Sequence, residues 1–175
     1  NNKRVIFITD RSNLFSDLAR DLIDIGEWER FRPMITNADG KILNIMGDAE
    51  EIAQPLTATE MKRVMEGDPA DINANIIFTT YSHINGDDSA KGEWLKSLCK
   101  DSLVICDEAH IAAGSDSNIA RQMQDLVDNS WGVMYSSATW AKSSKNLHIY
   151  ARALPESVNI SQVVAAMKED GESFG

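Results

Sequence analysis

Four short apolar runs, separated by helical stretches, constrain the fold of this 175-residue chain more than any other feature. Each run is rich in β-branched, aromatic or other large apolar residues, lacks strict alternation with polar residues, and ends in a polar loop. The runs are residues 5–9, 76–80, 103–106 and 132–135. Such runs are typical of strands that are covered on both faces of a parallel sheet. The sequence therefore predicts an α/β fold in which the four runs are neighbouring parallel strands, with helices on both faces.

Helical patterns occupy the stretches between these runs. Residues 12–25 carry apolar side chains at three- and four-residue intervals, and Gly26 can end that helix in the left-handed conformation. Thr57 and Glu60 form a capping-box pattern that opens a second helix, which we expect to end at Gly67. Further elements are expected as helices at residues 93–99, 117–127 and 160–168 and as an extra strand at residues 41–46.

Composition narrows the classes of protein to consider. With 43% hydrophobic and 25% charged residues, the chain can build one domain core, and residues 1–175 are treated as one domain. No apolar run approaches the roughly 18 residues that span a membrane, so no membrane partner is expected. Cys99 and Cys106 lack metal-ligand spacing, and we expect reduced thiols in the cytoplasm, or in the nucleus of a eukaryote. The net charge of −10 argues against binding through a basic patch, but loop amides and hydroxyls can still hold the phosphates of DNA or RNA.

Two acidic residues directly after the third run are the sharpest candidates for catalysis. Asp107, Glu108 and His110 belong to the tetrapeptide Asp-Glu-Ala-His. Ligands bind at the carboxyl ends of strands in sheets of this type. Asp107 is therefore expected to hold Mg²⁺ through water, and Glu108 to orient the water that attacks a phosphoryl group. A charged turn at a strand end is the simpler interpretation, and direct metal ligation by all three side chains in a hydrolase is another.

A Ser-Ala-Thr motif follows the fourth run. It consists of Ser137, Ala138 and Thr139. Small hydroxyl residues at a strand end can hydrogen-bond to a neighbouring site and shift with it. Alone the motif does not distinguish such a role from an ordinary loop, but it gains weight because it comes one strand–helix unit after the two acids.

Polar loops also follow the first two runs. Thr9, Asp10, Arg11 and Ser12 end the first run and open a helix, and Thr80 and Tyr81 end the second run. Hydroxyls, amides and an arginine at a helix N-terminus suit phosphate oxygens, so these six residues are candidates for nucleic-acid binding. Ordinary capping of the helix by Ser12 and turn formation explain the same residues equally well.

In this order, the motifs of the chain resemble those of the first RecA-like domain of superfamily-two helicases. Two segments narrow the resemblance: residues 12–26, and residues 135–142 followed by 146–151, are similar to strawberry-notch-type helicase-like proteins, which occur in phages and other mobile elements as well as in eukaryotes. The resemblance implies a P-loop NTPase fold, ATP and Mg²⁺ as cofactors of the full-length parent, and DNA or RNA and a second RecA-like domain as partners. It also implies that the loops after the first two runs contact the nucleic-acid backbone and that His110 and the Ser-Ala-Thr motif couple nucleotide state to strand movement.

The chain departs from the family pattern at the phosphate-binding loop. Its sequence contains no Gly-x-x-x-x-Gly-Lys-[Ser/Thr] segment, whose amides and lysine cradle the phosphates. We expect residues 1–175 to be a partial first motor domain that follows this loop, binds no nucleotide tightly and hydrolyses little ATP. A non-catalytic scaffold or nucleic-acid clamp derived from a helicase domain is the alternative.

The resemblance also predicts an exposed strand. In the family, the strand of the phosphate loop lies beside the strand that ends in Ser-Ala-Thr. Without it, residues 132–135 would present unpaired backbone groups, which recruit partners and are costly when buried. We therefore expect this strand to pair with another copy of the chain or with residues 41–46, or to leave the domain marginally stable.

Overall fold

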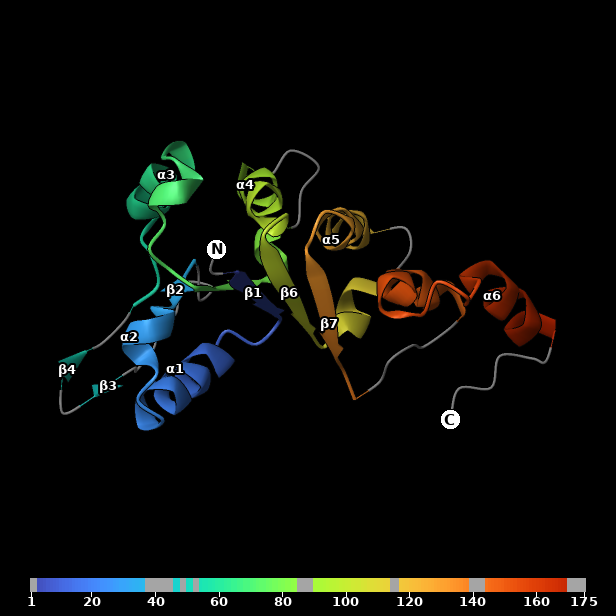
Figure 1. Ribbon diagram of the computed structural model, residues 1–175, viewed down its shortest axis with the longest axis horizontal. Helices are drawn as coiled ribbons and strands as arrows, with labels where there is room; N and C mark the ends of the chain where they lie inside the picture. The colour runs from blue at the N-terminus through green and yellow to red at the C-terminus, as the bar shows by residue number, and fades with distance from the viewer. Residues whose placement is uncertain are drawn as a thin grey trace.

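A five-stranded sheet forms the centre of the protein (Figure 1). The computed structural model describes residues 3–36, 46–47, 50–51, 54–84, 90–113, 117–138 and 144–169. The strand order is β2-β5-β1-β6-β7 and every pairing is parallel. The strands are β1 (Arg4–Thr9), β2 (Met34–Ile35), β5 (Ile76–Thr80), β6 (Ser102–Asp107) and β7 (Gly132–Ser136). Because β5, β1, β6 and β7 contain the four apolar runs, the predicted neighbouring parallel strands are confirmed.

The fifth strand, β2, was not predicted from the sequence. Met34 and Ile35 lie opposite Ile77 and Phe78 of β5. Thr36 fixes this pairing, since its backbone N–H and its hydroxyl both donate to the Phe78 carbonyl, at 2.9 Å and 3.1 Å. A strand of two residues has no periodicity that a sequence pattern could reveal.

Helices cover both faces of the sheet. The α-helices are α1 (Leu14–Asp24), α2 (Trp28–Phe31), α3 (Ala58–Glu66), α4 (Ala90–Cys99), α5 (Asn118–Asp128) and α6 (Ile160–Glu169), and the 3-10 segments are η1 (Pro69–Asp71), η2 (Tyr81–Ile84), η3 (Ala109–Ala113) and η4 (Ser144–Ala153). One face packs against α3, α4, α5 and η4 in a cluster that includes the fully buried Ile6, Ile8 and Val104. The other face packs against α1 and α2, where Phe15 stacks on Phe78 with ring centroids 5.2 Å apart. In Figure 1, α1 and α2 accordingly lie on the opposite side of β1 from α3 and α4.

Cover on the second face decreases toward β7. In β6, Val104 and Cys106 are buried, whereas Leu103 and Ile105 on the α1 side are only half-buried. Met134 of β7 is paired with Ile105 and is 53% exposed. The continuous apolar runs therefore led us to expect more complete cover at this end of the sheet than the structure has.

Local signals in the sequence set several helix ends as predicted. The Thr57 hydroxyl accepts from the Glu60 backbone N–H, and the Glu60 carboxylate accepts from the Thr57 N–H, which is the expected capping box. Gly26 has φ +74°, the left-handed conformation expected after α1. Helix α1 begins at Leu14 rather than at Ser12, and its N-cap residue, Asn13, makes no side-chain capping bond.

The expected extra strand is only partly within the described residues. Residues 41–45 lie outside them. Met46 pairs with Glu51 in a separate two-stranded sheet of β3 (Met46–Gly47) and β4 (Glu50–Glu51), not with β7. The segment that packs beside β7 is η4, toward which the Tyr135 hydroxyl donates a hydrogen bond to the Ile149 carbonyl. Of the three alternatives for β7, pairing with residues 41–46 is therefore contradicted for Met46, and pairing with another copy and marginal stability stay predictions.

Candidate functional site

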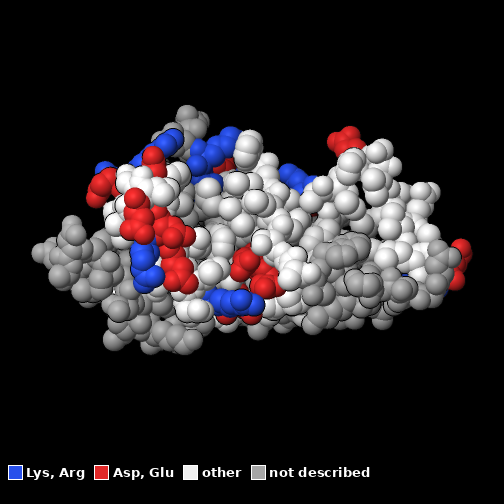
Figure 2. Space-filling model, turned by 90° about the horizontal axis from the view of Figure 1, so that it is seen from below, with Lys and Arg blue, Asp and Glu red and all other residues white. Residues whose placement is uncertain are grey.

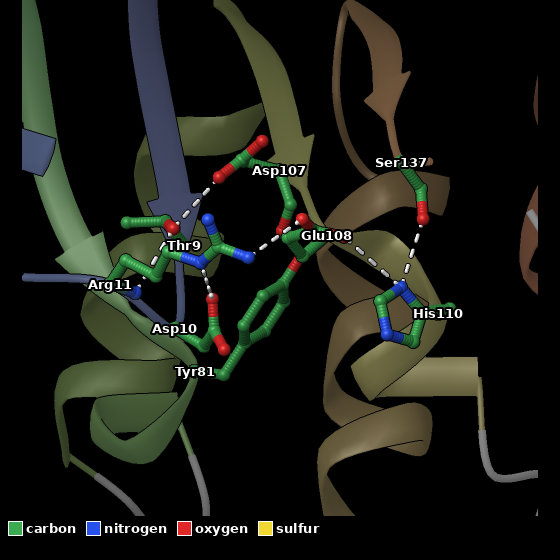
Figure 3. Close-up of polar contacts among 8 residues, drawn as sticks. All are labelled: Thr9, Asp10, Arg11, Tyr81, Asp107, Glu108, His110 and Ser137. Carbon is green, nitrogen blue, oxygen red and sulfur yellow. Dashed lines mark hydrogen bonds and ion pairs between the residues drawn. The ribbon is translucent and has the colours of Figure 1, made fainter. Parts of the chain in front are cut away.

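The carboxyl ends of β1, β5 and β6 bring the predicted site residues together (Figure 3). Thr9 is paired with Thr80, and Ile8, one residue earlier, is paired with Cys106. This register places the ends of the three strands, and the loops that follow them, side by side. Asp107, the last residue of β6, therefore stands next to Thr9.

Asp107 is held by residues from both neighbouring loops. The Thr9 hydroxyl donates to Asp107 Oδ2 at 2.9 Å, and the Tyr81 hydroxyl donates to the Asp107 backbone carbonyl at 2.8 Å. Thr9 Oγ1 also accepts the backbone N–H of Arg11 at 3.1 Å. Burial raises the pKa of the Tyr81 phenol far above its ordinary value, so this side chain stays a hydrogen-bond donor. Thr9 thus holds the Asp107 carboxylate beside β1, and Tyr81 of η2 holds the Asp107 backbone.

Glu108 has an unusual backbone conformation. Its φ is +50°, in the left-handed region that costs a non-glycine residue roughly 1–2 kcal/mol. Its side chain is 18% exposed and both carboxylate oxygens have cationic or polar neighbours. Oε1 lies 3.1 Å from Arg11 Nη2, and Oε2 lies 3.3 Å from His110 Nδ1. Residues held in sparsely populated conformations cluster at functional sites, because the surrounding structure must enforce them.

His110 joins β6 to the end of β7. His110 Nδ1 lies 2.9 Å from the Ser137 hydroxyl, which hydrogen-bonds to it as donor or acceptor according to the imidazole tautomer. Of the other residues in the Ser-Ala-Thr motif, Ala138 is exposed and Thr139 lies outside the described residues. The acids and the first residue of that motif therefore form one connected polar group, although the motif's coupling role stays a prediction.

The six nucleic-acid candidates differ in accessibility. Asp10 and Arg11 are exposed, and the Arg11 side chain is 60% exposed. The other four are almost fully buried: Thr9, Ser12, Thr80 and Tyr81. Two of these, Thr9 and Tyr81, donate to Asp107, and the Thr80 hydroxyl hydrogen-bonds to Ser82 at 2.8 Å. Contact with nucleic acid through the buried four stays a prediction, and of these four only Thr9 bonds to the loop around Arg11, by accepting the Arg11 backbone N–H.

The remaining polar and sulfur groups offer no metal centre in the part of the chain that the structure describes. There, no three His, Cys, Asp or Glu residues converge as a ligand set. The buried thiols have raised pKa values because burial disfavours the thiolate, to about 12 at Cys99 and further at Cys106. Direct ligation of a metal by Asp107, Glu108 and His110 therefore has no support among the described residues.

Sequence reasoning found the acids but missed the bonds from Thr9, Tyr81 and Arg11 that reach them. The signal was available once the strand order was known, since three loops that follow adjacent parallel strands meet at one edge. The order itself is not encoded in any local pattern. The contact of Arg11 with Glu108 also depends on a side-chain conformation that no spacing rule specifies.

The sheet, its helices and the acids at its carboxyl edge define a RecA-like α/β domain. The sequence matches the family described as type III restriction enzyme, res subunit, over residues 1–140, and the chain belongs to this family. Its helicase-like domain is that of ATP-dependent nucleic-acid motors, which bind nucleic acid and use ATP and Mg²⁺. Comparison with curated proteins found no match. None of the described helices is long and apolar enough to cross a membrane.

Proposed function

We propose that residues 1–175 form part of the first motor domain of an ATP-dependent helicase or translocase that moves on DNA or RNA. In this proposal Asp107, Glu108 and His110 belong to the nucleotide site. The β1–α1 loop, with Arg11 at its surface, contacts the nucleic-acid backbone. The full-length parent supplies the phosphate-binding loop and a second RecA-like domain, and acts in the cytoplasm or nucleus.

One observation carries the proposal: the end of β1 and the loop that follows it are bonded directly to the two acids. Thr9 donates to Asp107, and Arg11 pairs with Glu108. A motor must link the occupancy of its nucleic-acid site to chemistry at its nucleotide site. Thr9 and Arg11 supply such a link, because each contacts one of the two acids directly through its side chain.

The acids suit a hydrated Mg²⁺ ion and a phosphoryl substrate. Mg²⁺ usually keeps several waters and takes one or two carboxylates together with substrate phosphates. Asp107 fits this use, because its position is fixed by Thr9 and Tyr81 and no further protein ligands are required. When bound, Mg²⁺ supplies charge stabilisation to the phosphoryl group. Glu108, at the next position, would orient water. His110 would couple changes at the nucleotide site to the end of β7 through its hydrogen bond with Ser137.

The narrower relationship to strawberry-notch-type proteins is also a proposal. It is supported by residues 12–26, 135–142 and 146–151, which include helix α1 and most of η4. A phage or mobile-element origin and assignment to the Asp-Glu-Ala-His class of helicases are part of the same proposal. The open reading frame that surrounds these residues is the direct test, since a Gly-Lys-Thr loop upstream would be expected.

A non-catalytic scaffold or nucleic-acid clamp derived from a helicase domain is the alternative function. Both candidates predict negligible ATP turnover by the 175-residue chain alone. They differ in the parent protein, where the motor predicts magnesium-dependent hydrolysis that Glu108→Gln abolishes while ATP binding persists. Hydrolysis that is absent from the parent would favour the clamp.

Nucleic-acid binding by the 175-residue chain tests the proposed function. Fluorescence anisotropy with labelled single-stranded DNA and RNA would give affinities over a series of salt concentrations. Arg11→Gln is expected to weaken binding for all sequences and to lower the salt slope by about 1, because one phosphate contact is lost. Arg20→Gln is the matched control, since Arg20 is an exposed arginine on α1, paired with Asp17 and not with the acids. Equal effects of the two substitutions would contradict the placement of the nucleic acid at this loop.

A further inference from the structure

Arg11 stands between the surface where nucleic acid would bind and the acid that would orient water. Its side chain is 60% exposed, yet its Nη2 lies 3.1 Å from Glu108 Oε1. Asp10 Oδ1 lies 3.8 Å from its Nε, so the guanidinium has carboxylates on two sides (Figure 3). The same cation is therefore accessible from solvent and engaged with the candidate catalytic acid.

Glu108 is restrained at several points. Its backbone is in the left-handed region, one carboxylate oxygen faces Arg11 and the other faces His110. Arg11 supplies the charge-assisted contact that holds this carboxylate in one orientation, because His110 Nδ1 also contacts the Ser137 hydroxyl at 2.9 Å. Loss of the Arg11 contact would leave the His110 contact as a pivot.

We propose that Arg11 is a positioning residue that restrains the Glu108 carboxylate until a nucleic-acid phosphate takes its guanidinium. Phosphate and Glu108 then compete for one cation. This inference rests on the proposed function and adds a regulatory step to that site. When nucleic acid binds at the β1–α1 loop, the Glu108 carboxylate is released from Arg11 and can orient a water molecule.

The relative strength of the two contacts makes the exchange feasible. Ion pairs with a largely exposed partner are weak, since water screens them. Guanidinium can bind a backbone phosphate through two parallel N–H bonds, whereas Glu108 receives only one contact, from Nη2, so the phosphate can form the stronger charge-assisted contact. Basic residues are in the minority: the net charge of the sequence is −10, and on the face drawn in Figure 2 the described Lys and Arg residues are interspersed with acidic ones. A single arginine therefore carries much of the attraction at this loop.

Competition requires a reciprocal effect on binding. If Glu108 competes with phosphate for Arg11, then Glu108→Gln should tighten the binding of single-stranded oligonucleotide to the 175-residue chain. We expect an increase of about two- to fivefold at low salt, the range set by a weak ion pair. The measurement is fluorescence anisotropy with the same labelled oligonucleotide throughout.

The double variant separates competition from simple repulsion. Removing the Glu108 charge would also reduce general repulsion of phosphates, and that effect does not need Arg11. In the Arg11→Gln background, competition predicts that Glu108→Gln changes affinity no further, whereas repulsion predicts the same factor in both backgrounds. The same factor in both backgrounds would overturn the inference and leave the proposed function intact.

An NMR measurement follows the carboxylate directly. The ¹³Cδ resonance of Glu108, assigned by its loss in Glu108→Gln, should move when saturating oligonucleotide is added. In Arg11→Gln it should already lie near the shifted position and respond little. A wild-type resonance that stays in place while the oligonucleotide is bound would refute the competition. If no oligonucleotide binds the wild type or Glu108→Gln even at low salt, the proposed function fails, and this inference fails with it.

Discussion

Strands β1 and β7 belong to the same parallel sheet, but they differ in how completely they are enclosed. β1 has β5 on one side and β6 on the other, and its Ile6 and Ile8 are fully buried. β7 has β6 on one side, and no other described strand pairs with its outer edge. Met134 is 53% exposed, and Trp131, just before the strand, is 56% exposed. The chain thus places its polar site between a rigid strand and one that is only partly supported.

The surroundings of β7 are largely apolar. A groove of about 470 Å³ runs between β7 and the C-terminal elements η4 and α6, lined by residues such as Tyr135, Leu147, Tyr150 and Val163. Figure 2 shows few charged residues on the half of the molecule that holds these elements, and most of the drawn charges on the other half. The contrast teaches that Asp107 follows directly from an interior strand, whereas Ser137, which contacts His110, follows the less enclosed strand β7.

The largest expected difference between the two strands is in stability. Ile6→Ala removes a fully buried side chain of the larger core cluster and should lower the free energy of unfolding by about 2–5 kcal/mol. Met134→Ala removes a half-exposed side chain and should change it by no more than about 0.5 kcal/mol. Urea unfolding of both variants and the wild type gives the comparison. Equal losses would mean that β7 is covered in solution by something other than the described residues.

Two tyrosines allow a finer comparison of the same regions. The Tyr81 hydroxyl donates to the Asp107 carbonyl in the interior, and the Tyr135 hydroxyl donates to the Ile149 carbonyl in η4. Tyr81 is 2% exposed whereas Tyr135 is only half-buried, so Tyr81→Phe, which leaves the part-buried Asp107 carbonyl without its donor, should cost about 1–3 kcal/mol. Tyr135→Phe should cost about 0.5–1.5 kcal/mol, and faster amide hydrogen exchange should be confined to η4 and its neighbours. A larger cost at Tyr135 than at Tyr81 would reverse the proposed order of rigidity.

The same tyrosines predict a pH dependence. Burial raises the pKa of both phenols above the ordinary value of about 10. A group whose folded pKa is raised stabilises the fold fully below its unfolded pKa, and this contribution falls as pH rises through and beyond that value. The wild type should therefore lose stability above about pH 10, and a variant with both substitutions should lose less over the same interval.

The comparison also marks how far sequence could lead. The continuous apolar runs predicted four of the five strands of the main sheet, and the spacing of Thr57 and Glu60 predicted the capping box, because both signals lie within a few consecutive residues. β2 has only two residues, which is too short to show a period. η4 is a 3-10 segment that was not predicted from the sequence. The motif residues Asp107, Glu108, His110 and Ser137 were identifiable from their place after strands, but the partners of each depend on strand order and side-chain conformation.

The smallest expected change in unfolding free energy belongs to a substitution that tests the open edge of β7 through self-association. An uncovered strand edge flanked by exposed apolar side chains recruits strands from other molecules. We expect the 175-residue chain to associate in a concentration-dependent way, and Met134→Lys to weaken that association by placing a charge beside the edge. Its unfolding free energy should stay within about 0.5 kcal/mol of the wild type, because Met134 is half-exposed.

Ile25→Lys is the matched control, since Ile25 is 68% exposed at the end of α1 and should leave association unchanged. Sedimentation velocity over a range of concentrations separates the outcomes. A monomer at every concentration, with strong cooperative unfolding, would show that β7 tolerates an open edge, and that the packing of η4 and α6 beside it is sufficient protection.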